Sequence, residues 1–481
     1  MHPGNLSRRG FMQTSMAALT FGVGLPAWFA RELFASAELR AAEDKKTPDS
    51  PNEKLMLGAI GFGAPNGRQD ALYHAAKGHK GVEYIAACDV DKRHLESDKG
   101  LPLMKKDGFD AKGYSDFREL LDNPKIDAVT IAVPDHWHAL IAIEALRRKK
   151  HVYCEKPLTL TIAEGKALVK VANETGRTFQ VGSQQRSEMN GMFRLACELV
   201  RNGRIGKIKQ VETRVGGNPT CDPIPKVEVP EGLNWDFWLG PAPQADYVER
   251  KSDGRMVNCR TPYEFRWFYE YSGGKMTDWG AHHNDIAQWG LDMDGNGPIA
   301  VEADGAEPSK DPNAYNTHPT FKITYTYANG VKLLCSSHQL DGAIDPKETV
   351  LKGKDGKDRK ESHDNGVLFI GENNQWIFVS RGIITASDPK LIDEPLPADA
   401  KRLYDAKGDH MGNFLECIRT GKPTICPAEV GHRSVTVCHL GTIALRSGLK
   451  LGWDPKAEVF NTPEGNKMLS RPMRAPWKLE V

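Results

Sequence analysis

Apolar and polar residues follow a repeating strand–helix order along residues 55–181. Short, wholly apolar runs indicate buried strands, and longer segments with apolar residues on one face indicate helices. The predicted strands are residues 55–60, 82–89, 128–133, 151–154 and 178–181. The predicted helices are residues 71–76, 117–121, 139–148 and 162–175. Strands that alternate with helices at this spacing predict an α/β unit with a parallel, doubly wound sheet.

The pattern changes after residue 184. A helix at 192–202 and a strand at 207–215 are followed by a long loop, 216–271, rich in Pro, Gly and Trp. Further alternating stretches lie at residues 320–327, 331–337, 347–351, 367–370 and 375–379. They predict a large open, mainly antiparallel sheet with one covered face. Two helices, 410–420 and 429–447, are expected to pack on or beside it.

Composition places the chain among soluble globular proteins of two domains, with 481 residues, 40% apolar and 26% charged. The net charge of +1 gives no indication of a nucleic-acid partner. No segment predicts a membrane span in the mature protein. The nine cysteines include no CxxC pair, which favours buried thiols over disulfides or a zinc site.

The N-terminus carries a twin-arginine pattern at residues 7–12 (Ser-Arg-Arg-Gly-Phe-Met), followed by a mildly apolar stretch, 16–30. Small residues at 35–37 and 40–42 offer cleavage sites. We therefore predict a twin-arginine signal peptide over residues 1–42, a polar linker over 43–53, and a periplasmic or otherwise exported protein. The alternative is a basic, amphipathic helix that stays attached.

Glycines follow the first predicted strand where the next helix begins. They let the backbone approach phosphate groups, while the helix N-terminus faces the negative charge. The residues predicted to contact a dinucleotide are Gly61, Gly63, Ala64, Asn66, Gly67 and Arg68. Asp89 ends the second strand, where a carboxylate would hold ribose hydroxyls and repel a 2′-phosphate, which favours NAD over NADP. Asp91 is close enough to be an alternative.

Two later strand ends should reach the same crevice. Residues 133–138 (Val-Pro-Asp-His-Trp-His) place Pro134, His136 and His138 near the cofactor. The histidine pair invites a metal, but no third ligand is nearby, so no metal is predicted; the histidines could also cap or pack the next helix. Lys156, before Pro157, would lie by the reactive ring, where it can hold a substrate hydroxyl.

Asp278 and His282 are four residues apart in a predicted helix and share one face. They can converge on one substrate hydroxyl and relay its proton, which makes Lys156, Asp278 and His282 the predicted catalytic set. In the alternative, this helix is a packing element and His282 is only hydrogen-bonded. Asp285 would orient a partner or cap structure.

These segments, in this order, resemble the Gfo/Idh/MocA oxidoreductase family, in particular its exported bacterial members, over residues 54–451. The resemblance rests on the glycine turn, residues 134–138, 155–157 and 180–186, and the Asp278/His282 pair. It implies a Rossmann NAD-binding domain (54–185), with Glu155 and Gln184 at the cofactor. An α/β domain (186–455) would follow, with the insert 216–271 and an open sheet that supports a dimer or tetramer, and then a tail (456–481).

The implied function is NAD(P)-dependent hydride transfer at a secondary hydroxyl of a small carbohydrate, cyclitol or polyol. The alternative is an exported glycoside hydrolase with tightly bound NAD that oxidises, eliminates, hydrates and reduces in turn, with His283 or an insert tyrosine as an extra base. A non-catalytic sensor is a third possibility, which the presence of Lys156 disfavours. The insert aromatics form either a sugar-stacking wall or a loop core; they are Trp235, Trp238, Trp267, Phe268 and Tyr269.

Overall fold

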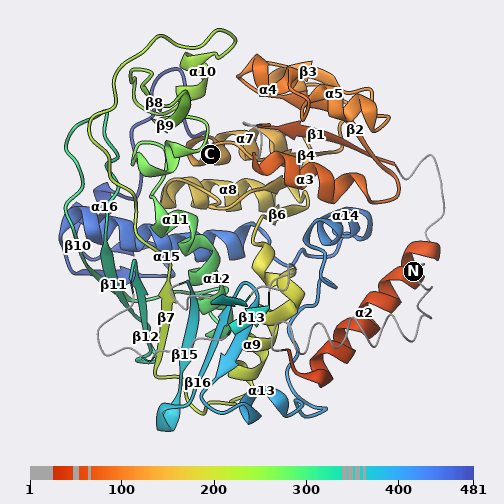
Figure 1. Cartoon of the computed structure of the whole chain (residues 1–481), viewed down its shortest axis with the longest axis vertical. Helices are drawn as coiled ribbons and strands as arrows, with labels where there is room; N and C mark the ends of the chain where they lie inside the picture. Colours follow the sequence, from red (N-terminus) through yellow and green to blue (C-terminus); the bar gives the residue numbers. More distant parts are fainter. Residues whose placement is uncertain are drawn as a thin grey trace.

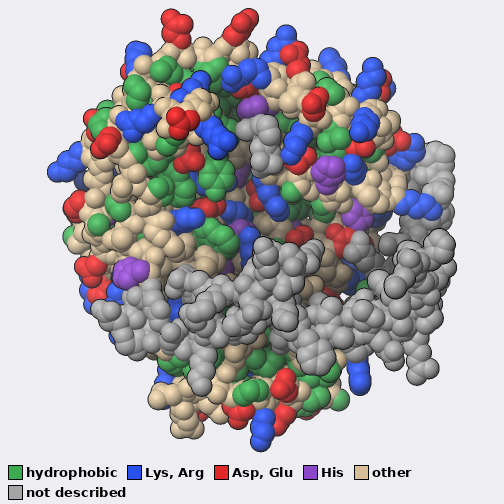
Figure 2. Space-filling model, in the orientation of Figure 1, with side chains coloured by type: hydrophobic (Ala, Val, Ile, Leu, Met, Phe, Trp, Pro, Cys, Tyr) green, Lys and Arg blue, Asp and Glu red, His purple; other side chains and the backbone are tan. Residues whose placement is uncertain are grey.

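The computed structural model describes residues 25–46, 54–62, 67–338, 344, 350–352, 358–360 and 365–480. A parallel sheet with its helices lies above a second unit built on a larger sheet, and helix α2 lies at one side (Figure 1). Positive and negative side chains are interspersed over the face seen in Figure 2. No helix in the described ranges is long and apolar enough to cross a membrane.

The first sheet has six parallel strands in the order β3-β2-β1-β4-β5-β6. The strands are β1 Leu55–Ile60, β2 Val82–Cys88, β3 Lys112–Tyr114, β4 Ala128–Ile131, β5 His151–Cys154 and β6 Phe179–Val181. The helices are α3 Arg68–Lys77, α4 Lys92–Glu96, α5 Leu101–Lys106, α6 Phe117–Leu121, α7 Asp135–Arg147 and α8 Ile162–Thr175. The doubly wound prediction is confirmed. Strand β3 was not predicted, because two of its three residues are exposed and no apolar run marks it.

The second sheet has nine strands in the order β17-β16-β15-β7-β12-β11-β10-β18-β19. The strands are β7 Gln210–Arg214, β10 Ala300–Gly305, β11 Phe321–Thr326, β12 Lys332–Ser336, β15 Gly366–Ile370, β16 Trp376–Ser380, β17 Ile383–Ala386, β18 Leu451–Asp454 and β19 Val459–Phe460. Only β7 and β12 run parallel within it, so the mainly antiparallel prediction is confirmed. The predicted strand 347–351 is corrected: β13 (Val350–Lys352) pairs with β14 (Asp358–Lys360) in a separate two-stranded sheet.

Helices α9 (Met192–Arg201), α12 (Gly280–Gly290) and α15 (Ala428–Ser447) pack on the second sheet. Helix α15 also contacts α8, so it joins the two units. Helix α14 (His410–Thr420) packs on α3 and adds Phe414 to the core of the first sheet. The remaining short elements are α11 Lys275–Asp278, α13 Lys390–Asp393, α16 Pro463–Lys467, η2 Gln184–Arg186, η3 Met189–Gly191 and η5 Glu372–Asn374.

The insert 216–271 is not an irregular loop. It contains α10 (Trp235–Leu239), the hairpin β8 (Glu249–Ser252) and β9 (Arg255–Cys259), and η4 (Glu264–Trp267). These pack around a small aromatic core of their own. The insert is also tied to the first unit, because Lys92 N donates to Gly232 O and Asn234 N to Val90 O, each at 2.9 Å.

Helix α2 (Ala27–Lys46) runs through both predicted cleavage sites and into the predicted linker, of which residues 43–46 are helical. Leu25 and Phe29 are buried in the core of the second unit. The Arg194 guanidinium lies 5.0 Å from the Phe29 ring centre, and Trp28 Nε1 donates to Ile392 O at 3.0 Å. The twin-arginine motif itself, residues 7–12, lies outside the described residues.

Candidate functional site

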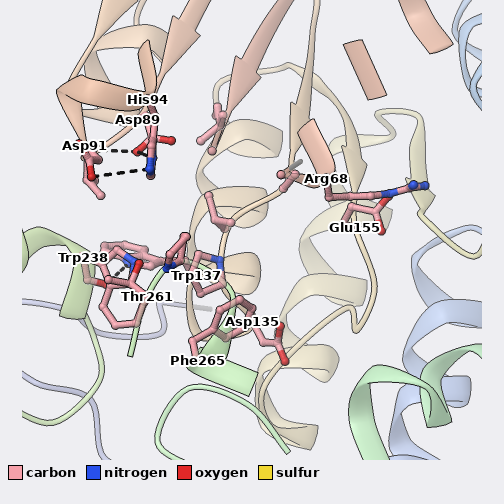
Figure 3. Close-up of a pocket in the computed structure, with 18 of the residues that line it drawn as sticks. Arg68, Asp89, Asp91, His94, Asp135, Trp137, Glu155, Trp238, Thr261 and Phe265 are labelled. Carbon is pink, nitrogen blue, oxygen red and sulfur yellow. Dashed lines mark hydrogen bonds and ion pairs between the residues drawn. The ribbon is translucent and has the colours of Figure 1, made fainter. Parts of the chain in front are cut away.

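A cavity of about 680 Å³ lies at the carboxyl ends of β1, β2, β4 and β5 and is walled on the other side by the insert. Figure 3 shows Asp89 and His94 at one end of it and Glu155 with Arg68 at the other, with Trp238 and Phe265 facing them. Ligands of open α/β sheets bind at this edge. The volume is that of a small-molecule or cofactor site.

The turn after β1 fits a dinucleotide. Gly61 has a φ of +87°, and a Cβ there would lie 2.7 Å from Ala132 O, so only glycine can let the chain turn this closely. Gly67 is the residue before α3, and with Arg68 it lines the cavity, which opens that helix N-terminus toward a bound phosphate. Gly63, Ala64 and Asn66 lie outside the described residues.

The two carboxylates after β2 have different partners. Asp91 accepts from Arg93 N at 3.0 Å as the N-cap of α4, and it is paired with the Arg93 side chain. Both carboxylates line the cavity and lie near His94; Asp89 accepts from Asp91 N at 2.8 Å and lies 3.3 Å from His94 Nδ1. Burial opposes the charge on His94, but the Asp89 and Asp91 carboxylates raise its pKa. Asp89 therefore keeps the position expected of a ribose-binding acid.

Glu155 lies at the opposite end of the cavity and is buried. Arg68 Nε contacts its Oε1 at 2.8 Å, and Gln184 Nε2 donates to the same oxygen at 2.7 Å. Burial acts to raise the pKa of Glu155, but the Arg68 charge lowers it, so the carboxylate stays ionised. A Cβ at Gly182 would lie 2.8 Å from this carboxylate, so glycine leaves the room that it needs. Gln184 does not line the cavity; it acts through Glu155.

Lys156 and Asp278, 122 residues apart, meet at this end. Lys156 Nζ donates to Asp278 Oδ1 at 2.6 Å and to Asp278 O at 3.3 Å. Arg266 Nε lies 3.5 Å from the same Asp278 oxygen. Burial acts to raise the pKa of Asp278, but the charges of Lys156 and Arg266 lower it to about 2. Lys156 lines the cavity, with Asp278 behind it.

The predicted helix through Asp278 and His282 is interrupted. It ends as α11 at Asp278 and resumes as α12 at Gly280. In a regular α-helix the His282 N–H would donate to the carbonyl of Asp278, four residues earlier; here it donates to Trp279 O, three residues earlier, at 3.0 Å. The carbonyl of Asp278, which a continuous helix would use, is left to accept from Lys156. The helix break therefore adds a second contact that fixes the lysine.

His282 follows in the first turn of α12 and is buried. Burial and the charges of Lys156 and Arg381 hold its pKa well below the usual range. Its Nδ1 is buried without a hydrogen-bond partner in the described structure. A neutral imidazole with an unused nitrogen, beside a fixed ammonium, can take a proton from a hydroxyl.

His136 and His138 do not line the cavity, in contrast to the prediction. His136 Nε2 lies 3.0 Å from Trp238 O, and burial lowers the pKa of His136 to about 3. The two ring nitrogens of His138 lie 2.7 Å from Pro157 O and 2.9 Å from Val133 O. Both rings face backbone carbonyls of neighbouring segments, so they hold the walls in place. Pro134 does line the cavity, just before α7.

Most of the insert aromatics are loop core. Trp235, Trp267 and Phe268 pack in the insert's own cluster, and only Trp238 of the five also lines the cavity. The ring of Tyr269 is flanked by two guanidinium groups, those of Arg446 at 3.7 Å and Arg471 at 3.6 Å.

Two of the polar residues after His282, His283 and Asp285, are structural. His283 is fully buried and bonds Asn365 Oδ1 at 2.8 Å, and burial lowers its pKa to about 4. Asp285 is paired with Arg186 at 2.8 Å and accepts from Ser434. Neither lines the cavity, and neither does His282; what separates the two histidines is that the Nε2 of His283 is held by Asn365, which makes His283 a poor candidate for an additional catalytic base.

Among the polar residues of the site that were not predicted, three bear on its chemistry. Arg266 and Asp135 line the cavity, and Arg381 influences His282 from the turn between β16 and β17. Asp135 accepts from Ser272 Oγ at 2.5 Å. Their partners lie far away in sequence, so no local pattern marks them. Across the described part of the chain, no group of three or more His, Cys, Asp or Glu residues could hold a metal ion, and all nine cysteines are free.

Two family models match this chain. Residues 55–183 match "Oxidoreductase family, NAD-binding Rossmann fold" of the GFO_IDH_MocA group. Residues 219–363 and 395–479 match "Oxidoreductase family, C-terminal alpha/beta domain" of the same group.

Among curated relatives, inositol 2-dehydrogenase of Salmonella typhimurium is 27% identical over 180 residues, which are 37% of this chain and 50% of that protein. The chain thus spans half the length of such relatives. The uncharacterised oxidoreductase YrbE of Bacillus subtilis is 25% identical over 395 residues, 76% of this chain and 94% of that protein.

Solved structures share the fold. Aldose-aldose oxidoreductase from Caulobacter crescentus superposes with a TM-score of 0.56 at 19% identity, over 83% of this chain and 99% of that one. The WlbA dehydrogenase from Bordetella pertussis, solved with NADH and UDP-GlcNAcA, gives a TM-score of 0.56 at 17% identity, over 83% and 99%.

Proposed function

Because the chain belongs to the Gfo/Idh/MocA oxidoreductase family, we propose that it transfers a hydride between a nicotinamide cofactor and a secondary hydroxyl of a sugar, cyclitol or related polyol. The observation that carries this proposal is the Lys156–Asp278 contact beside His282, at the opposite end of the cavity from Asp89. Inositol and sugar oxidoreductases among the relatives support the substrate class.

NAD, held by the Gly61 turn, the N-terminus of α3 and Asp89, would supply the hydride acceptor. An ammonium has three N–H donors, and Asp278 takes two of those of Lys156, which leaves one for the substrate oxygen. His282, kept neutral, accepts the hydroxyl proton during oxidation and returns it during reduction. Asp278 holds Lys156 in position and balances its charge.

Replacement of the lysine tests this proposal. Lys156→Met should reduce turnover about a hundredfold or more, the usual contribution of a positioned proton-transfer group, while NAD still binds. NADH formation over a panel of polyols gives turnover, and calorimetric titration gives NAD affinity. Lys170→Met, on the exposed side of α8, is the matched control. Wild-type turnover in Lys156→Met would remove the lysine from the mechanism.

The preference for NAD over NADP rests on Asp89. A carboxylate at the end of the second strand repels a 2′-phosphate and accepts from ribose hydroxyls. We assign NAD on this basis.

The alternative reaction, redox-assisted glycoside hydrolysis with retained NAD, is favoured by the position of the insert. Its backbone is bonded to Val90 and Lys92 beside Asp89, and its Thr261, Phe265 and Arg266 form the facing wall. A dinucleotide in this cavity would be enclosed between two units of the protein. Native mass spectrometry should then show one nucleotide per subunit, and an aryl glycoside should be cleaved without added NAD. Nucleotide-free protein that turns over only with added NAD would eliminate this alternative.

We also propose export by the twin-arginine pathway and assembly into a dimer or tetramer. Export rests on the motif at residues 7–12. Replacement of both arginines by lysine should keep the protein in the cytoplasm, and N-terminal sequencing of the exported form would locate the cleavage site relative to α2. The oligomer would use the open face of the nine-stranded sheet and can be measured by light scattering.

A further inference from the structure

Arg381 does not line the cavity described above, but it contacts the segment that carries the proposed catalytic residues Asp278 and His282. It lies in the turn between β16 and β17, and its guanidinium lies 4.6 Å from the ring centre of Trp279, the residue at the helix break. In the amide orientation that satisfies both neighbours, Gln185 accepts from Arg381 Nε at 3.2 Å and donates to His282 O at 3.1 Å. Arg381 is therefore fixed to the same short segment as Asp278 and His282.

Among the described residues of this site, Arg381 is the cation without a paired carboxylate. Arg68 contacts Glu155 at 2.8 Å, and Lys156 and Arg266 contact Asp278 at 2.6 and 3.5 Å. Arg381 makes no ion pair with any described residue. Among the nearby carboxylates, that of Glu188 is itself weakened, because burial raises its pKa.

The stacking leaves the recognition edge of Arg381 available. A guanidinium that lies on an aromatic ring uses its face, whereas the N–H groups that bind a carboxylate lie in its plane. Gln185 occupies Nε, and the two terminal nitrogens have no hydrogen-bond partner among the described residues. Two parallel N–H groups match the two oxygens of a carboxylate.

We propose that Arg381 binds the carboxylate of the substrate, which makes a sugar acid, such as a uronate or aldonate, the preferred substrate class of this site. The proposal rests on the proposed hydride transfer and specifies its substrate. The hydroxyl that reacts at His282 and Lys156 and the carboxylate at Arg381 would belong to one small molecule.

The test compares matched acidic and neutral sugars. Wild-type protein loaded with NAD should bind and oxidise glucuronate better than glucose. At a pH well above the acid limb of His282, Arg381→Gln should lose about tenfold to a hundredfold in Kd and kcat/KM for glucuronate, as expected for a charge-assisted pair, and much less for glucose. Arg381→Lys keeps the positive charge but lacks the two parallel N–H groups of the guanidinium, so its Kd and kcat/KM for glucuronate should lie between those of wild type and Arg381→Gln. Arg446→Gln, which removes an exposed guanidinium stacked on Tyr269, is the control and should change neither substrate.

Several outcomes would contradict the proposal. Equal binding of the acidic and neutral sugars by wild type, or an unchanged preference in Arg381→Gln that is folded by circular dichroism, removes Arg381 from substrate recognition. A stronger preference for glucose 6-phosphate than for glucuronate, lost in Arg381→Gln, overturns the sugar-acid assignment. Calorimetry separates a failure of this proposal from a failure of the proposed function. If only the proposed function fails, sugar acids still bind through Arg381, but no polyol yields NADH.

Discussion

The two ends of the cavity are built in different ways. At the β2 end, defined by Asp89, Asp91 and His94, the side chains bond residues two to five positions away in sequence. At the lysine end, defined by Lys156, Asp278 and His282, the decisive contact joins residues 122 positions apart, and the pKa values of Asp278 and His282 are both lowered. Local turn geometry thus builds one end, and packing of two units builds the other.

The largest effect is expected at the lysine end. Asp278→Asn keeps the shape but leaves the Lys156 charge without its partner, so turnover should fall about a hundredfold or more while NAD affinity changes little. Steady-state kinetics and NAD titration measure the two quantities. Asp116→Asn, which removes the charge that pairs with Arg118 at the N-terminus of α6, should leave both unchanged. Near-wild-type turnover in Asp278→Asn would mean that Lys156 does not depend on this contact.

At the β2 end, the choice of cofactor should change and the chemistry should not. Asp89→Ala removes the charge that would repel a 2′-phosphate, so the NAD/NADP ratio of kcat/KM should drop about tenfold or more, with kcat retained. Asp91→Asn, which preserves the cap of α4, should leave the ratio unchanged. If Asp91→Asn lowered the NAD/NADP ratio and Asp89→Ala left it unchanged, Asp91 and not Asp89 would be the residue that selects the cofactor.

A smaller effect tests the tie between the insert and the β2 end. Asn234 is the N-cap of α10, accepting from Phe237 N at 3.0 Å, and its own N–H bonds Val90 O. Asn234→Ala should cost about 1 kcal/mol of cap energy and so speed NAD release about fivefold. Stopped-flow displacement measures the rate, with the cap substitution Thr462→Ala in α16 as control. An unchanged release rate would show that the insert does not retain the cofactor.

The smallest effect concerns pH. Because the folded pKa of His282 is lowered, the neutral form that can accept a proton persists below pH 6.5, and the acid limb of polyol oxidation should lie well below that value. Arg381→Gln removes one of the charges that lower this pKa and should move the limb upward. A limb at or above pH 6.5 in wild type would contradict a buried, neutral His282.

The same pKa values set the sign of the effect on stability. Groups whose folded pKa is depressed stabilise the fold above their unfolded pKa and lose that contribution as pH falls through the folded value. The Asp278 contribution should therefore be complete above about pH 4 and lost as pH approaches 2. That of His282 should decline as pH falls below 6.5. Urea titrations at stepped pH measure both.

Sequence reasoning recovered most of the first unit, because its strands are continuous apolar runs and its helices carry clear caps, such as the Thr161–Glu164 capping box of α8. Its short motifs also named Lys156 and Asp278, which the fold brings into contact, while their catalytic role stays a prediction. It missed features that depend on tertiary contact: the strands β3, β10, β14, β17, β18 and β19, the compact insert, and Arg266 and Arg381. It misplaced His136 and His138, since a strand-end position does not tell whether a ring faces the ligand or a backbone carbonyl.

Helix α2 shows the same limit. The apolar stretch of the signal prediction, residues 16–30, runs into its first turn, yet Leu25, just before the helix, and Phe29 within it are buried in the second unit, as they would be in any protein core. An apolar run of this length is compatible with both roles, because export machinery and a protein core select the same side chains.

The absent side chain at residue 182 has a consequence for attempts to re-engineer this protein. An alanine there would compete for space with the Glu155 carboxylate, which Arg68 and Gln184 hold from two other sides. Substitution libraries that vary residues 155 and 68 should therefore leave position 182 untouched, since a single methyl group would shift the acid and change every variant in the same way.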